Sequence, residues 1–273
     1  MASPNGKQLL RSSFHLFRRD PRMIWLSVLG TAASLLGFVA MTGIVVVVFF
    51  SASLTGGFDV LAVLPGYFVL TAISIFFSAA VVFAASDRIE GSTPTVRGSV
   101  RKAWGRKSVI LRWAFLAFIV GTLVALLERG TGGIAGRVFG FLGALAWGVA
   151  TFLVLPVLAF EDLRPIQAVE QSARLFEQRF GAVGRTAVRF GVVFLGWILV
   201  PVVAIFVGLM LISALPPLGI LVVALGALGL FAVVQAAVTA GIYMRTILYR
   251  YATGQSVPDL GLDLSETFSL APR

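Results

Sequence analysis

The chain has 273 residues, of which 58% are hydrophobic and 12% are charged, and it contains no cysteine. Soluble domains average about 25% charged residues, so this composition is typical of a membrane protein, and the missing cysteine excludes disulfides, thiolate metal sites and cysteine nucleophiles. The formal net charge is +10, but no nucleic-acid recognition motif accompanies it, so we expect no nucleic-acid partner.

Six long apolar runs predict six membrane-spanning helices. Each run contains at least the roughly 20 residues that, at about 1.5 Å per residue, cross a hydrocarbon core of about 30 Å. Because lipid offers the backbone no hydrogen-bond partners, the runs must be helical. We therefore expect an all-α membrane protein with a single six-span domain over residues 1–255 and a short, flexible cytoplasmic tail over 256–273. The expected spans are residues 23–50, 60–85, 108–127, 138–160, 186–212 and 218–248.

The segment before each consecutive pair of spans predicts an amphipathic helix. The first lies before the first span, the second is capped by Thr93 with Pro94 at its first position, and the third opens at Pro165. Apolar faces combined with basic residues are typical of helices that lie in the membrane interface. The expected architecture is three helical hairpins, each preceded by such an interfacial helix. The segments that follow the second and sixth spans, residues 88–94 and 250–258, also resemble each other.

The distribution of Lys and Arg predicts the orientation. Twenty of these residues lie in the four segments on one side of the predicted spans, and two, Arg129 and Arg137, lie on the other side. Basic residues near span ends stay cytoplasmic, so we expect a multi-pass protein of the plasma membrane with both termini in the cytoplasm. Anionic headgroups attract such residues. The candidate lipid-headgroup contacts are Arg97, Arg101, Lys102 and Arg106.

The sequence offers little that indicates catalysis. Its one histidine, His15, has no second histidine or cysteine with which to complete a metal site. The nucleophile elbow, the P-loop and the zinc-protease motif are missing. We also expect no charge in the interior of a span, where one usually marks a transport pathway. The sequence therefore predicts no enzyme activity, no cofactor and no metal.

The most suggestive polar group follows the fourth span, where Glu161 and Asp162 lie side by side. Arg88 and Arg250 end the other two inward-running spans at a similar depth, so the four side chains form a candidate cytoplasmic ion-pair cluster, because the planar guanidinium suits carboxylates. Independent headgroup contacts and local caps are the favoured alternative. An anion or headgroup site is a third reading.

Within the spans, Gln235 and Thr239 lie one turn apart, a pattern more typical of an interhelical hydrogen bond than of a substrate contact. Pro201 removes a backbone hydrogen bond from the fifth span and predicts a kink there. Small residues at four-residue spacing in the fourth span predict close helix packing, which we expect within the chain rather than in a dimer. These residues are Gly132, Gly136, Gly140, Ala144 and Gly148.

The exit of the fourth span resembles a known family. A proline in the span, an acidic pair at its exit, and alanine and serine spaced along the next helix make up residues 156–162 and 166–176. This pattern is similar to that of the domain-of-unknown-function family numbered 6159, a group of uncharacterised six-span membrane proteins. The resemblance implies the fold and topology but no activity. A looser likeness to the membrane domain of some glycerophosphodiester phosphodiesterases carries no hydrolytic chemistry over to this chain.

Two hypotheses for the function follow. The leading one is a non-enzymatic structural or accessory membrane protein that binds lipid, anionic on the cytoplasmic side, or a membrane-protein partner. The alternative is a permease or lipid translocator, in which the small-residue ridge, Pro201 and Gln235 would form a pathway.

Overall fold

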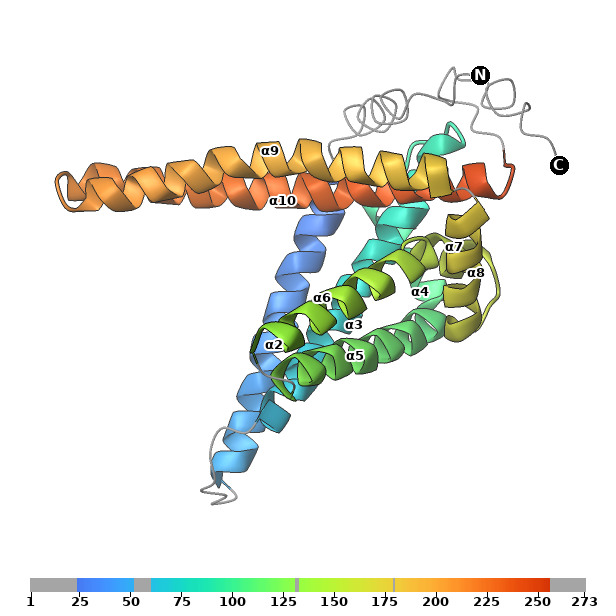
Figure 1. Cartoon of the computed structure of the whole chain (residues 1–273), viewed down its shortest axis with the longest axis horizontal. Helices are drawn as coiled ribbons and strands as arrows, with labels where there is room; N and C mark the ends of the chain where they lie inside the picture. The colour runs from blue at the N-terminus through green and yellow to red at the C-terminus, as the bar shows by residue number, and fades with distance from the viewer. Residues whose placement is uncertain (1–23, 52–59, 131–132, 179, 256–273) are drawn as a thin grey trace.

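The computed structural model describes residues 24–51, 60–130, 133–178 and 180–255, and these are helices joined by short turns (Figure 1). The helices are α2 (Ile24–Ser51), α3 (Val60–Ile89), α4 (Val96–Gly105), α5 (Lys107–Gly130), α6 (Gly133–Ala150), α7 (Val154–Phe160), α8 (Pro165–Gln178), α9 (Phe180–Ile212) and α10 (Pro216–Ala252). His15, the first predicted interfacial helix and the predicted tail lie outside the described residues.

Six stretches are long and apolar enough to cross a membrane, which confirms the predicted number of spans. Helices α2, α3, α5, α9 and α10 each supply one of them. The fourth predicted span differs from the expectation because it consists of two helices, α6 and α7, separated by a turn at Thr151–Leu153. The membrane-spanning length is therefore preserved while the helix itself is broken.

Consecutive helices pack in pairs, α2 with α3, α5 with α6 and α9 with α10. The pairs meet at one end and diverge from it, and α9 and α10 run side by side away from α2, α3, α5 and α6 (Figure 1). We call the end where they meet the basic end; it comprises α4, α7, α8 and the last turns of α3 and α10. Most of the buried apolar residues lie there, among residues 79–89, 103–114, 153–176 and 240–249. Elsewhere on the spans most side chains are exposed or half-buried, as lipid-facing residues are.

Glycines allow close approach within two of the pairs. A Cβ on Gly37 of α2 would lie 2.7 Å from Ile73 of α3, and one on Gly226 of α10 would lie 2.7 Å from Ile205 of α9. The predicted small-residue ridge is different. Gly140 is buried, but Ala144 and Gly148 are exposed, and a Cβ on Gly148 would meet nothing within 4 Å. The expectation that this ridge packs within the chain is therefore wrong for its second half.

The packing of the other two ridge residues is not described. Gly132 lies outside the described residues, and only the position of Gly136 in α6 is given.

Pro201 lies inside α9, which continues as one helix through it.

Helices α3 and α10 end in the same way. Gly91 and Gly254 both have a positive φ, at 81° and 72°. The N–H of Ser92 donates to the carbonyl of Asp87, and that of Gln255 donates to the carbonyl of Arg250, both at 2.9 Å. These bonds satisfy carbonyls that a helix end leaves free. The resemblance of the two segments in sequence thus corresponds to one local geometry.

The protein covers part of the apolar side of each of the two helices that the sequence places in the interface, while Trp104 of α4 and Ile166 of α8 stay exposed. In α4, Ala103 is buried and Val96 and Val100 pack against the core, and in α8 Ala168 and Leu175 are buried. The start of α4 also differs from the prediction. Its N-cap is Thr95 rather than Thr93, because the Thr95 hydroxyl accepts the N–H of Gly98 at 3.1 Å. The predicted start of α8 at Pro165 is confirmed.

Candidate functional site

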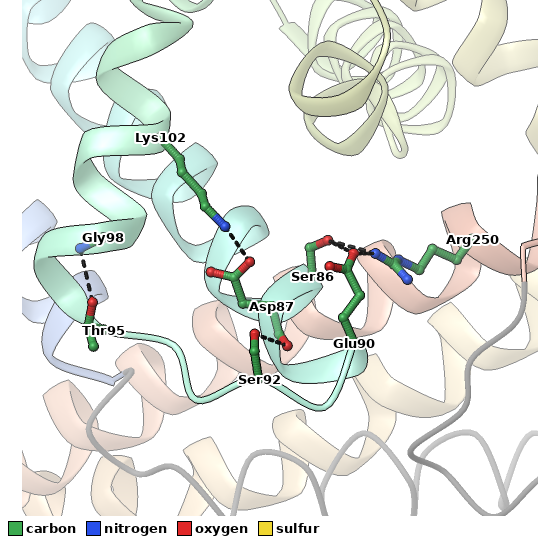
Figure 2. A network of polar contacts seen from close by, with 8 residues as sticks. All are labelled: Ser86, Asp87, Glu90, Ser92, Thr95, Gly98, Lys102 and Arg250. Atoms are coloured by element: carbon green, nitrogen blue, oxygen red, sulfur yellow. Dashed lines mark hydrogen bonds and ion pairs between the residues drawn. The ribbon is translucent and has the colours of Figure 1, made fainter.

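The basic end carries a network of ion pairs that joins α3, α4 and α10 (Figure 2). Arg250 in the last turn of α10 donates from Nη2 to the carboxylate of Glu90 and, at 2.7 Å, to the hydroxyl of Ser86. Lys102 of α4 pairs with Asp87 of α3. The Arg250 side chain is only 10% exposed, whereas that of Glu90 is 55% exposed. A buried guanidinium is thus held by a carboxylate that reaches it from the surface.

The acidic pair after the fourth span has other partners. The Tyr249 hydroxyl donates to Oε1 of Glu161 at 2.7 Å, and Arg106 donates from Nη1 to Oδ1 of Asp162 at 3.3 Å. Phe160 stacks on the Tyr249 ring with the centroids 5.7 Å apart. These contacts fasten the end of α7 to α10 and to α4.

The predicted four-residue cluster is therefore differently paired. The carboxylate that holds Arg250 is Glu90, and neither Glu161 nor Asp162 is its partner. Arg88 lies in the last turn of α3. The sequence reasoning missed Ser86 and Glu90, although their i, i+4 spacing at the end of the second span places them on one helix face.

The environment of Glu90 shifts the pKa of its carboxyl group. Burial by itself raises this pKa, but the hydrogen bonds from Arg250 and Ser86 and the charges of Arg250 and Lys102 outweigh burial and hold it below its usual value. Glu90 is therefore ionised at neutral pH, and the pair with Arg250 is a true ion pair.

One face of α4 stays open to the surroundings. Arg97, Arg101 and Trp104 follow one another at i, i+4 and i+7 and are all exposed, Trp104 by 60%. The ammonium of Lys107 lies 4.8 Å from the centre of the Trp104 ring. We call Arg97, Arg101 and Trp104 of α4, together with Lys107 at the start of α5, the α4 stripe. Of the four predicted headgroup contacts, Arg97 and Arg101 belong to the stripe, while Lys102 and Arg106 are engaged by Asp87 and Asp162.

The break between α6 and α7 is held from α8. The backbone N–H of Leu153 donates to the hydroxyl of Ser172 at 3.0 Å, and Ser172 is fully buried. A buried backbone N–H without a partner costs about 1–3 kcal/mol, so this serine stabilises the turn by satisfying the N–H of Leu153, while Thr151, Phe152 and Val154 donate to backbone carbonyls. The sequence gives no direct signal for this contact, since the two residues meet only in the folded chain.

Arg245 of α10 lies beside the same break. Its guanidinium carbon is 4.9 Å from the centre of the Phe152 ring, and its Nε is buried without a hydrogen-bond partner among the described residues. No ion pair to Arg245 is found in that part of the chain either. Arg245 falls within the continuous sixth apolar helix, near its basic end.

The polar residues predicted in the sixth span join it to the first. Gln235 donates from Nε2 to the hydroxyl of Thr31 at 2.8 Å, and the hydroxyls of Thr239 and Ser27 lie 2.7 Å apart. Gln235 and Thr239 are buried. These are interhelical hydrogen bonds between α10 and α2, and they use the groups that a substrate would otherwise contact.

Six membrane-length apolar stretches and a polar network gathered at one end define a multi-pass membrane protein. Comparison of the sequence with family models gives a match over residues 57–257 to the family of unknown function DUF6159. This range covers most of the chain, and the chain belongs to that family. No curated protein and no solved structure matches, so the looser likeness to the phosphodiesterase membrane domain is not shown.

Proposed function

We propose that this chain is a non-enzymatic accessory protein of the plasma membrane whose α4 stripe binds anionic lipid headgroups on the cytoplasmic side. The observation that carries the proposal is the arrangement of Arg97, Arg101, Trp104 and Lys107 on one exposed face beside the apolar spans. Basic residues attract anionic headgroups, and tryptophan is enriched at the membrane interface.

The orientation is part of the proposal. Basic residues accumulate on the cytoplasmic side of membrane proteins, and the described helices α4, α7 and α8 all belong to the basic end (Figure 1). Three hairpins, each following an interfacial helix, would give this arrangement with both termini in the cytoplasm. The ion pairs to Asp87 and Asp162 favour a rigid end on which the stripe is presented.

The test replaces Arg97 and Arg101 together with glutamate. The variant and the wild type are reconstituted in nanodiscs with equal amounts of phosphatidylglycerol and phosphatidylcholine, and the lipids retained after extraction are quantified by mass spectrometry. We expect the enrichment of phosphatidylglycerol to fall several-fold, because each Lys or Arg near an anionic surface contributes about 1 kcal/mol. Arg106 is left unchanged, since it pairs with Asp162.

The matched control replaces Arg164 and Arg174, two exposed arginines at or in α8, with glutamate. It changes the net charge of the protein by the same amount. Unchanged lipid enrichment in the Arg97/Arg101 variant, or an equal loss in both variants, would contradict a site on the stripe.

The alternative function, a permease or lipid translocator, is favoured by a different observation. The fourth span is broken beside Arg245, and broken helices commonly form the substrate sites of transporters. Reconstitution in proteoliposomes tests it: the alternative expects flux of a lipid or solute that Gln235→Leu reduces. If no flux is detected for any lipid or solute class, this alternative function is contradicted. Since Gln235 already bonds to Thr31, we rank this function second.

A further inference from the structure

Arg245 is a cation that the described part of the chain does not neutralise. Its contact is the face of Phe152, and its Nε is buried without a hydrogen bond. Arg250, one and a half turns further along α10, also has a buried Nε without a hydrogen bond, but its guanidinium has both Glu90 and Ser86 as partners. An aromatic face attracts a cation but supplies no counter-charge, so the guanidinium of Arg245 lacks the anion that a partly buried charge requires.

The length of α10 indicates where along the membrane Arg245 lies. The helix has 37 residues, so it is about 55 Å long and exceeds a bilayer of about 40–45 Å with its headgroups. We place the turn before Pro216 at the headgroups of the far leaflet. The helix then needs about 20 residues to cross the hydrocarbon core, and the near boundary of the core falls close to Ala240. Arg245 then lies about 7 Å beyond this boundary, at the level of the near phosphate groups.

Among the described residues, no carboxylate forms an ion pair with the guanidinium of Arg245. Phe152 covers one face of it, and Phe176 of α8 packs edge-on against Phe152 with the ring centres 5.9 Å apart. The nearest acidic group along α7, Glu161, accepts a hydrogen bond from Tyr249. Arginine presents a planar fork of donors that fits two oxygens of one oxyanion.

We propose that Arg245 binds a phosphate oxyanion, supplied by the headgroup of a lipid, at the break of the fourth span. The site is separate from the α4 stripe, since it lies on α10 and the turn before α7 and uses one guanidinium rather than a charged surface. The site takes a single phosphate-bearing lipid. The acyl chains of this lipid would lie along the apolar faces of α6 and α10.

The experiment compares the purified full-length wild type with Arg245→Met and Arg245→Lys in a mild non-ionic detergent. Dioleoyl phosphatidylglycerol is titrated in native mass spectrometry, and dioleoylglycerol, which has the same chains but no phosphate, is the paired ligand. We expect the wild type to retain one phosphatidylglycerol in preference to dioleoylglycerol. Arg245→Met is expected to bind it at least tenfold more weakly, and Arg245→Lys, which keeps the charge but loses the fork, to fall between the two.

A thermal readout separates binding from a purely structural role. Without added lipid, Arg245→Met is expected to melt no lower than the wild type, because the charge that it removes has no ion-pair partner among the described residues. Phosphatidylglycerol is expected to raise the melting temperature of the wild type and not that of Arg245→Met. A delipidated Arg245→Met protein that is markedly less stable than the wild type, or equal lipid binding by both, would overturn the proposal.

Competition with inorganic phosphate identifies the source of the oxyanion. If millimolar phosphate leaves the bound phosphatidylglycerol in place, the lipid headgroup is the ligand. If phosphate displaces it and stabilises the wild type but not Arg245→Met, the same site takes free phosphate. Retention of dioleoylglycerol as tight as that of phosphatidylglycerol would show that no phosphate is recognised.

Discussion

Replacing Gly219 with alanine is expected to lower the melting temperature of the protein in detergent by about 5–10 °C, from a loss of about 2–3 kcal/mol. A Cβ at this position would lie 2.5 Å from the backbone N of Ile212 and 2.8 Å from the carbonyl oxygen of Gly208. Both are backbone atoms of α9, so no side chain can rotate away. The two helices must separate near their connecting turn, and the loss is measured by a thermal unfolding assay.

Two other glycines of the same helix pair provide the control. A Cβ on Gly196 of α9 would meet nothing within 4 Å, and one on Gly229 of α10 would make an ordinary 3.5 Å contact with Pro201. Alanine at either position is expected to leave the melting temperature unchanged or to raise it slightly, because glycine weakens a helix by about 0.5–1 kcal/mol relative to alanine. Equal melting of all three variants would show that α9 and α10 do not pack at Gly219.

Replacing Glu90 with glutamine is expected to cost about 1–3 kcal/mol of stability. The change removes the carboxylate that neutralises the buried Arg250 and leaves Ser86 as its hydrogen-bond partner. The cost stays below that of a fully buried pair because the Glu90 side chain is 55% exposed. Chemical or thermal unfolding at pH 7 measures it. The control is Asp162→Asn, whose 94% exposed side chain pairs with Arg106 at 3.3 Å and should contribute less than about 0.5 kcal/mol.

The pH dependence gives the same pair a second test. Because the pKa of Glu90 is lowered in the folded protein, its contribution is fully present above the pKa of the unfolded chain and is lost as pH falls through the folded value. The difference in stability between the wild type and Glu90→Gln is therefore expected to persist from pH 7 to about pH 5 and to shrink below about pH 4. A difference that stays constant down to pH 3 would show that Glu90 acts without its charge.

Much of the fold was predictable because lipid imposes one rule on every apolar run. The six spans, the start of α8 at Pro165 and the matching ends at Gly91 and Gly254 all follow from local chemistry. The N-cap of α4 was misplaced by two residues, from Thr93 to Thr95, since both threonines offer the same hydroxyl and the choice depends on which one reaches a backbone N–H.

The candidate site was predicted less well, because its pairs join residues far apart in the chain. Arg250 was expected near Glu161 and Asp162, but the packing of α10 on α3 brings it to Glu90. Arg97, Arg101, Lys102 and Arg106 were all predicted to contact headgroups, but Lys102 and Arg106 are ion-paired in the folded chain. Residue type and spacing were equally suitable in all four.

The sequence by itself determined the number of spans and the side on which basic residues gather, because hydrophobicity and charge act on each segment separately. The tertiary structure decided where a span breaks and which glycines pack. The turn after α6 depends on the buried hydroxyl of Ser172, and Gly219 differs from Gly148 only in having another backbone beside it. Such contacts depend on the distance between helices, which no local pattern contains.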